Sequence, residues 1–323
     1  EEVRRTSMKF ISVSLVKNEA DIIELFIRVN SRVIDHFFIV DNGSTDHTIK
    51  IINKLKDEGY NITLYLDPAT AYVQDKMTTR ALRTAASSEK FDWAFILDAD
   101  EFINIPKEEL EKELATIKEE NTVAALRWSN WIPKGDIYYD YANPLWSCFE
   151  RKAKEEVDFV KIIVPYNLSQ KIMTSLGNHY ALLVRDFETA DLSFAQKSQS
   201  ITLECGVLDH VPVRSSGQIL TKTVIGEIAL SMKKLRNPHE GYHWRHNYKV
   251  IKEYNFEVDD SLLRYLGVNY LSDKGNFTDE VHPTDRLGLE TDVVKYRQLY
   301  RFNYRGRIFN YMQQLVESVR GTK

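Results

Sequence analysis

Residues 8–130 alternate short apolar strands with amphipathic helices, and this alternation constrains the fold of the 323-residue chain more than any other feature. Strands rich in β-branched and aromatic residues are expected at 9–16, 37–40, 62–66, 93–97 and 123–128. Apolar residues spaced three or four apart predict helices between them, at 20–29, after a cap at Ser44 or Thr45, along 73–85, and from Pro106 through Ile117. Strands alternating with helices predict a mostly parallel sheet flanked by helices.

Polar segments directly follow three of these strands. They are Val16-Lys17-Asn18-Glu19, Asp41-Asn42-Gly43-Ser44-Thr45-Asp46 and Asp98-Ala99-Asp100-Glu101. The carboxyl ends of parallel strands meet at one sheet edge, where open α/β sheets bind ligands. Two carboxylates one residue apart there can share a hard cation such as Mg²⁺ or Mn²⁺. The same two acids could instead cap a helix, but two caps one residue apart would be redundant. The pattern therefore favours a metal-dependent nucleotide site.

The three segments resemble those of family 2 glycosyltransferases with the GT-A fold, in particular a bacterial subgroup that reads KNEAD…DNGSTD…LDADEF. The resemblance covers about residues 9–130 and extends more weakly to about 222. It implies a nucleotide-diphosphate-sugar donor, a divalent metal (Mn²⁺ or Mg²⁺) and inversion at the anomeric carbon. By position, it implies that Asp41 contacts the uracil or ribose and that Lys17–Glu19 lines the base pocket. It also implies that Asp98 lies near the ribose and metal, and that Asp100 ligates the metal directly.

A later segment, Leu208–Ser215, also resembles the family and implies a third metal ligand at His210. Neutral imidazole is an acceptable ligand for Mn²⁺, although a lone histidine at a strand end is often only hydrogen-bonded. Arg214 offers a bidentate fork to a diphosphate, and Lys222 could assist it. The expected metal ligands are Asp98, Asp100 and His210. The expected nucleotide-sugar site is Val16, Lys17, Asn18, Glu19, Asp41, Ser44, Asp46, Lys76, Arg80, Asp98 and Arg214. For Lys76 and Arg80, a solvated basic face is an equal alternative.

The sequence leaves several alternatives for the general base. Many family members carry a Glu-Asp pair whose aspartate is the base, and no such pair occurs between Asp100 and His210. An inverting transfer needs a group that takes the proton of the acceptor hydroxyl. The alternatives are His179, Asp186, Glu150 and Asp209. His179, beside the glycine of a Gly-Asn-His turn, is preferred, and Glu101 is expected to act at the site or to orient a ligand.

The composition argues against several classes of protein. The net charge of −4 argues against nucleic acid, and no apolar run reaches the roughly 18 residues of a transmembrane helix. The N-terminus lacks the apolar region of a secretory signal. Cys148 and Cys205 are too few for a disulfide framework, which favours a cytoplasmic location. The aromatic residues between Trp128 and Trp146 suit either an acceptor sugar or a core, and the histidines at 239, 243 and 246 favour a surface helix.

We therefore expect a GT-A-like domain over 8–215 and a helical C-terminal extension over 216–323. The expected activity is transfer of a sugar from a UDP-sugar to a hydroxyl of a bacterial surface glycan, free or lipid-linked. A nucleotidyltransferase is the alternative enzyme, although the first strand-to-helix junction lacks the expected glycines, and a non-catalytic nucleotide- or glycan-binding module is the other alternative. Without Gly-x-Gly, a dinucleotide oxidoreductase is disfavoured. The basic tail suits either peripheral contact with the inner membrane face or contact with a second copy or a neighbouring polymerase domain.

Overall fold

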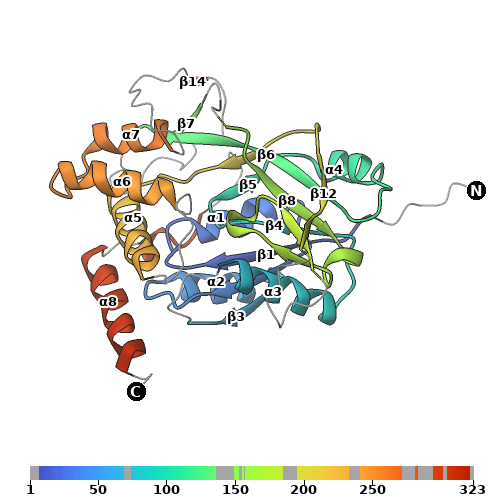
Figure 1. Cartoon of the computed structure of the whole chain (residues 1–323), viewed down its shortest axis with the longest axis horizontal. Coiled ribbons are helices and arrows are strands. Elements are labelled where there is room, and N and C mark those ends of the chain that lie inside the picture. The colour runs from blue at the N-terminus through green and yellow to red at the C-terminus, as the bar shows by residue number, and fades with distance from the viewer. Residues whose placement is uncertain are drawn as a thin grey trace, which may run out of the picture.

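The computed structural model describes residues 7–68, 74–135, 149–152, 155, 157–184, 195–232, 241–270, 281–282, 294–300 and 304–320. A curled sheet forms the centre, and helices cover both of its faces (Figure 1). The expected fold class, a mostly parallel sheet flanked by helices with a helical C-terminal extension, is confirmed.

Four neighbouring strands run parallel and carry the predicted site segments at their carboxyl ends. Their order across the sheet is β3 (Ile62–Leu66), β2 (His36–Asp41), β1 (Phe10–Val16) and β4 (Trp93–Ile96). The register pairs Val16 of β1 with Asp41 of β2, and Val13 of β1 with Ile96 of β4. β1, β2 and β3 therefore end level with one another, and β4 ends three residues earlier, opposite Val13. The segments that follow β1, β2 and β4 meet at one sheet edge.

Alternate side chains of these strands point to opposite faces of the sheet. Phe10 and Phe95 belong to the core on one face, whereas Ile11 and Ile96 belong to the core on the other. The first face is covered by α1 (Ile23–Asn30), α2 (Thr48–Asp57) and α4 (Lys107–Leu114), and the second by α3 (Gln74–Ser88). With both faces buried, the strands are almost entirely apolar until they reach the sheet edge.

The strands after β4 bring a distant segment back to the same edge. β8 (Val160–Pro165) runs antiparallel between β4 and β6 (Thr122–Pro133), and β7 (Phe149–Lys152) pairs with β6 and β14 (Val281–His282). β12 (Gln199–Thr202) and β13 (Leu208–His210) lie parallel to β6, and β13 also pairs with β5 (Glu101–Ile103). A separate small sheet contains β9 (Ile172–Thr174), β10 (Ala181–Leu183) and β11 (Gln196–Lys197). This pairing sets His210 opposite Glu101.

The C-terminal helices gather beside the carboxyl ends of the parallel strands (Figure 1). They are α5 (Ser216–Ser231), α6 (Tyr242–Glu253), α7 (Asp260–Val268) and α8 (Tyr304–Arg320). The helix α5 begins where Ser215 accepts a hydrogen bond at its Oγ from Gln218 N at 3.2 Å. Residues of α5, α6 and α7 share their own core, which includes Ile219, Ile251 and Leu263. The expected extension therefore forms, and it packs against the site edge.

Three expected helix starts differ from the structure. The helix expected from residue 20 begins at Ile23, after a turn. α2 begins at Thr48 after His47, because Ser44 and Thr45 are bonded to the neighbouring loop: Asn18 N donates to Ser44 Oγ at 2.8 Å, and Thr45 N donates to the Asn18 side chain at 2.8 Å. Pro106 precedes α4 as its N-cap residue instead of opening the helix, since its ψ of 140° is extended. These differences all concern the ends of helices, which are harder to assign than their interiors.

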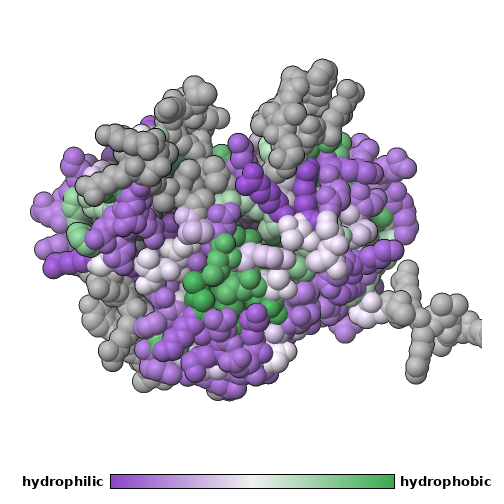
Figure 2. Space-filling view, turned by 90° about the horizontal axis from the view of Figure 1, so that it is seen from below, coloured by the Kyte–Doolittle hydropathy of each residue, from purple (hydrophilic) through white to green (hydrophobic). Residues whose placement is uncertain are grey.

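The surface seen from below the view of Figure 1 is largely hydrophilic, with one apolar area near its centre (Figure 2). Elsewhere, Phe309, Met312 and Val316 of α8 are exposed large hydrophobic residues. In the part of the chain that the structure describes, no helix combines the length and apolar character needed to cross a bilayer.

Candidate active site

A cavity of about 230 Å³ lies at the carboxyl ends of β1, β2 and β4, between this sheet edge and helices α5 and α8. Six of the expected nucleotide-sugar residues line it: Val16, Lys17, Asn18, Glu19, Asp98 and Arg214. The other lining residues are Leu15, Asn42, Gln74, Met77, Ala99, Gln218, Thr221, Lys222, Ile225, Gly226, Ala229, Trp244, Arg307 and Tyr311. The three segments that follow the strands thus meet in one cavity, as expected, and the C-terminal helices provide its opposite wall.

The loop after β1 is fixed by the loop after β2. Asn18 adopts a left-handed conformation with φ of 58°, which asparagine tolerates better than most residues. Next to it, Glu19 N donates to Thr48 Oγ1 at 2.9 Å, and Ala20 N donates to Asp46 Oδ2 at 3.1 Å. Ser44 and Asp46, expected to bind the nucleotide, therefore brace the Lys17–Glu19 segment and do not line the cavity.

Asp41 ends β2 behind the cavity wall. Its Oδ1 accepts from Gly43 N at 3.0 Å and from Ser44 N at 2.8 Å, which holds the turn. Its Oδ2 is buried, with no hydrogen-bond partner among the described residues. Burial raises the pKa of the Asp41 carboxyl. The neighbouring Asn42 lines the cavity in its place.

Three buried side chains could together hold a metal ion. Donor atoms of Asp100, Glu101 and His210 lie within 4.8 Å of one another. β13 places His210 here by pairing it with Glu101 of β5 and with Asn130 of β6. Two carboxylates and an imidazole suit Mn²⁺, and the carboxylates suit Mg²⁺. The donor set therefore fits the expected divalent cation.

Hydrogen bonds around His210 prepare one of its ring nitrogens for a ligand role. The amide nitrogen of Asn130 donates to Glu155 Oε2 at 2.8 Å, so the amide oxygen is the acceptor for His210 Nδ1 at 2.7 Å. That bond leaves Nε2 without a proton, 3.7 Å from Asp100 Oδ1. Burial lowers the pKa of His210 to about 3, so the ring is neutral. The ring also stacks on Trp128 at a centroid distance of 4.0 Å.

Asp100 lies between two basic side chains. Lys222 Nζ is 3.1 Å and Arg214 Nη1 is 3.5 Å from Asp100 Oδ2. Burial alone would raise the pKa of this carboxyl, but Lys222, His210 and Arg214 outweigh it and hold the pKa well below its ordinary value. Asp100 is therefore ionised at every pH at which the protein would work. Lys222 is 29% exposed and lines the cavity, so its ammonium can contact an incoming anion.

Asp98 lies outside the group of three donors. Its Oδ2 is 2.5 Å from the Nζ of Lys161, a lysine of β8 that is 1% exposed. The same ammonium lies 3.2 Å from Glu101 Oε1, which also accepts from Trp128 Nε1 at 2.9 Å. Glu101 Oε2 accepts from Asp98 N at 2.9 Å, and burial raises the pKa of Glu101 to about 8. The group that could hold a metal ion thus contains Glu101 in place of the expected Asp98, and Asp98 lines the cavity.

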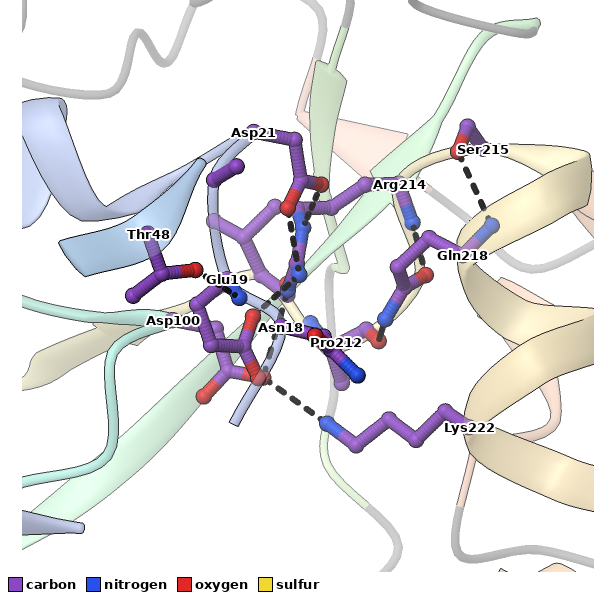
Figure 3. A network of polar contacts seen from close by, with 12 residues as sticks. Asn18, Glu19, Asp21, Thr48, Asp100, Pro212, Arg214, Ser215, Gln218 and Lys222 are labelled. Atoms are coloured by element: carbon purple, nitrogen blue, oxygen red, sulfur yellow. Dashed lines mark hydrogen bonds and ion pairs between the residues drawn. The ribbon is translucent and has the colours of Figure 1, made fainter. Parts of the chain in front are cut away.

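Arg214 is fully buried, and its guanidinium is committed to acids (Figure 3). Its Nε lies 2.6 Å from Asp21 Oδ2, and its Nη2 lies 2.6 Å from Glu19 Oε2. The guanidinium that was expected to bind a diphosphate is therefore already paired with carboxylates. Figure 3 shows Lys222, a residue of α5, contacting Asp100 from a different direction than the guanidinium of Arg214. Lys222, expected only to assist, lines the cavity with a partly exposed side chain.

His179 lies beside the metal-binding group, on the edge of the Trp128 ring that stacks on His210. Its centroid is 5.2 Å from that of Trp128. Its Nδ1 is 2.8 Å from the carbonyl oxygen of Val160, so Nδ1 donates and Nε2 can accept a proton. Burial lowers the pKa of His179 to about 4. The lowered pKa makes this imidazole a weaker base than an ordinary histidine, but its Nε2 is unprotonated and its orientation is fixed, as the geometry of a general base requires.

The other base alternatives are less suitable or lie outside the described residues. Glu150 pairs with Arg264 Nη1 at 2.8 Å, and Asp209, 3% exposed, accepts from Trp131 Nε1 at 3.0 Å. Asp186 lies outside the described residues. Glu101 is fully buried and belongs to the group that could hold a metal ion, so it is not placed to act as the base.

Other expectations have mixed outcomes. Lys76 and Arg80 are exposed on α3 and do not line the cavity, so the solvated basic face is the better interpretation. Trp128 and Trp131 are buried, which favours the core interpretation for these two, whereas Tyr138, Tyr139, Tyr141 and Trp146 lie outside the described residues. His243 and His246 lie on α6 and are half-buried, with the His243 ring centroid 5.7 Å from that of Tyr270, whereas His239 lies outside the described residues.

Sequence reasoning missed Lys161, Gln218, Arg307 and Tyr311. Lys161 did leave a signal, because a single lysine inside the apolar strand Val160–Pro165 needs a buried partner. Arg307 and Tyr311 are four residues apart on α8, a spacing typical of any helix face. No sequence pattern distinguished their side of α8.

Comparison with known proteins agrees with this geometry. The family model "Glycosyl transferase family 2" matches residues 13–163, just under half of the chain. A glycosyltransferase family 92 protein of Oryza sativa subsp. japonica is 30% identical over 104 residues, and the match spans 32% of this chain and 17% of that relative.

Solved structures similar to this chain include S. aureus TarS 1-349, with a TM-score of 0.37, 15% identity, and coverage of 74% of this chain and 69% of the other. The mannosyltransferase PcManGT from Pyrobaculum calidifontis in complex with GDP-Man and Mn²⁺ gives a TM-score of 0.39 and 16% identity, covering 81% and 70%. These structural likenesses are distant, and the family match carries more weight. Residues 13–163 span β1 through most of β8, including the three site segments, and their match supports a glycosyltransferase of family 2.

Proposed function

We propose that this protein transfers a sugar, with inversion, from a nucleotide-diphosphate sugar to an acceptor hydroxyl. A UDP-sugar is the proposed donor and a bacterial surface glycan the proposed acceptor, and both rest on the sequence resemblance. One observation carries the proposal: the cavity joins the segments after β1, β2 and β4 to Lys222, directly beside Asp100 and His210. This arrangement suits a ligand with a base, a diphosphate and a sugar in a row.

The residues of the chain suit the steps of an inverting transfer. Lys222 would leave its contact with Asp100 to meet the diphosphate, while the fixed guanidinium of Arg214 keeps the surrounding carboxylates in place. The acceptor oxygen attacks the anomeric carbon as the bond from that carbon to the diphosphate oxygen breaks. The proton of the acceptor hydroxyl passes to His179 Nε2. The products are the glycosylated acceptor and the nucleoside diphosphate.

Asp100, Glu101 and His210 would hold the divalent cation that the family resemblance implies. When bound there, the ion would neutralise charge that builds on the departing diphosphate. His210 is oriented for this role by its hydrogen bond to Asn130 and its stacking on Trp128. Lys161 and Lys222 pair with Glu101 and Asp100, respectively.

A donor panel tests the proposal. Release of nucleoside diphosphate should be measured from UDP-, GDP- and dTDP-sugars, with Mn²⁺, with Mg²⁺ and with a chelator. We expect one donor class to turn over with metal, and turnover to stop with the chelator. Pyrophosphate release from a nucleoside triphosphate and a sugar phosphate would instead identify a nucleotidyltransferase. Nucleotide binding without turnover of any donor, unaffected by metal, would favour a binding module.

The role of His179 gives a second expected result. Replacing His179 by glutamine should lower kcat by about 10²–10⁴-fold while nucleotide binding is unchanged, as expected for loss of a general base. Because the pKa of His179 is lowered to about 4, the imidazole is neutral above that pH. The wild-type kcat/KM should therefore fall only as the pH approaches about 4, and not near the ordinary histidine value of about 6.5.

Two glycines provide a matched control for this assignment. Gly177 has φ of 73°, and a Cβ built on it would lie 2.5 Å from His179 Nε2. Gly59 has φ of 99°, but a Cβ there meets nothing within 4 Å. Both alanine variants carry backbone strain, whereas only Gly177→Ala should displace the imidazole and lower kcat. Equal activity of the two variants, or a fully active His179→Gln, would remove His179 from the mechanism.

A further inference from the structure

The helix α8 supplies two buried side chains to a cavity otherwise built by segments far away in the sequence. Arg307 is 5% exposed and Tyr311 is 4% exposed, and both line the cavity. By contrast, Phe309 on the same helix is 60% exposed and Met312 is 52% exposed. The helix thus presents one face to the nucleotide cavity and another to the outside.

Arg307 joins α8 to both loops of the cavity. Its Nη2 lies 2.5 Å from Asp46 Oδ2, and its Nη1 donates to the carbonyl oxygen of Asn18 at 3.2 Å. Asp46 in turn accepts from Ala20 N, so one carboxylate connects the loop after β1, the loop after β2 and α8. This buried ion pair fixes the position of α8 relative to the Lys17–Glu19 segment.

The residues before α8 are also firmly attached to the domain. Glu24 of α1 is fully buried, and its carboxylate accepts from Lys295 N at 2.7 Å, from Tyr296 N at 2.9 Å and from Tyr300 Oη at 2.7 Å. His47 Nδ1 lies 2.9 Å from the carbonyl oxygen of Leu299. The 294–300 segment is therefore part of the domain surface, and α8 is held at the cavity by contacts before it and within it.

Tyr311 has the features of a ligand-contacting residue. Its hydroxyl oxygen is buried and has no hydrogen-bond partner among the described residues, a costly state for a polar group unless a ligand satisfies it. Its ring lies 5.1 Å from Lys17 Nζ, and Lys17 belongs to the segment expected to line the base pocket. An aromatic ring and a free hydroxyl together suit a nucleobase, which has a π-face and polar edge atoms.

We propose that α8 completes the nucleobase-binding part of the donor site, with Tyr311 contacting the base and Arg307 positioning the helix. This inference rests on the proposed function and deepens it, since it assigns part of donor recognition to the C-terminal extension. The phosphates would lie toward Lys222 and Asp100, while the base lies between the loop after β1 and α8.

The test is calorimetric binding to the full chain. The best binder among UDP, GDP, ADP and CDP is first identified with wild type, and inorganic pyrophosphate serves as a probe without a base. Tyr311→Leu should weaken nucleoside diphosphate binding about tenfold, because stacking of one base on an aromatic ring is lost, and should leave pyrophosphate binding unchanged. Tyr311→Phe should fall between Tyr311→Leu and wild type. Lys222→Gln should weaken both ligands.

Phe309→Leu on the outer face of α8 is the matched control and should bind like wild type. If Tyr311→Leu does not fold, hydrogen exchange of the wild type replaces it: the nucleotide, but not pyrophosphate, should slow exchange in 304–316. Tyr311→Leu binding within twofold of wild type, or unchanged exchange of α8, would overturn the role of α8 and leave the transferase standing. A wild type that binds none of the four nucleotides, and does not bind dTDP, would overturn both.

Discussion

Asp100→Asn is expected to lower kcat for sugar transfer by about 10²–10³-fold, the range seen when a group that stabilises developing charge is lost. Asparagine keeps the shape of the side chain but removes the negative charge that faces His210, Lys222 and Arg214. The affinity for Mn²⁺ should fall with activity, because Asp100 belongs to the only group of three side chains among the described residues that could hold a metal ion. The measurements are initial rates with the active donor and a Mn²⁺ titration.

Asp98→Asn provides the comparison for this prediction. Asp98 lines the nucleotide cavity and pairs with Lys161, and it lies outside the group of three donors. Its replacement should weaken nucleotide binding more than Mn²⁺ binding. An Asp100→Asn protein that is folded, active and still stimulated by Mn²⁺ at the wild-type concentration would exclude Asp100 as a ligand. The reverse ranking of the two variants would assign the metal to Asp98.

The second large effect concerns stability. Arg214→Met should lower the free energy of unfolding by about 3–5 kcal/mol, since it leaves buried carboxylates without their countercharge. Asp21 is fully buried, and Arg214 provides it with contacts of 2.6 and 3.2 Å. Arg214→Lys should not restore the full value, because an ammonium cannot reproduce the planar fork that reaches Asp21 and Glu19 together. Urea unfolding at neutral pH measures each change.

Arg127→Met is the matched control for Arg214→Met. Arg127 pairs with Glu204 on the surface, where the side chains are 39% and 72% exposed, so its loss should hardly change the free energy of unfolding. Adding Asp21→Asn to Arg214→Met should recover part of the lost stability, because the stranded charge is removed. Equal stability of the two arginine variants would show that the buried network is not needed for the fold.

The core of the fold was predictable because its signals are local. Alternation of apolar residues, turn residues after strands and spacing on helices are properties of neighbouring residues, and they correctly predicted β1, β2, β3, β4 and the helices between them. The parallel arrangement places the carboxyl ends of these strands at one sheet edge, and Asn18 and Asp98 line the same cavity there. The expectation of a histidine near Asp100 came from the family resemblance.

Pairings between distant residues were not predictable in this way. Arg214 and Asp21 are 193 residues apart, and Arg307 and Asp46 are 261 apart. An exposed arginine and a buried one look the same in sequence. Arg214 was therefore expected to bind phosphate, and its ion pairs with Asp21 and Glu19 could not be predicted. For Lys161, the apolar strand around it indicates that the charge is buried, but the sequence does not show that its partners are Asp98 and Glu101.

The sequence by itself determined an α/β sheet with acids at the carboxyl ends of its strands, because strand periodicity and parallel topology place those residues at one edge whatever surrounds them. The tertiary structure alone decided which acid joins His210, which cation stays available for a phosphate, and that α8 closes the cavity. These outcomes depend on how β13 inserts between β5 and β6 and on how the C-terminal helices pack, and burial there converts ordinary charged residues into fixed pairs that only long-range contacts can select.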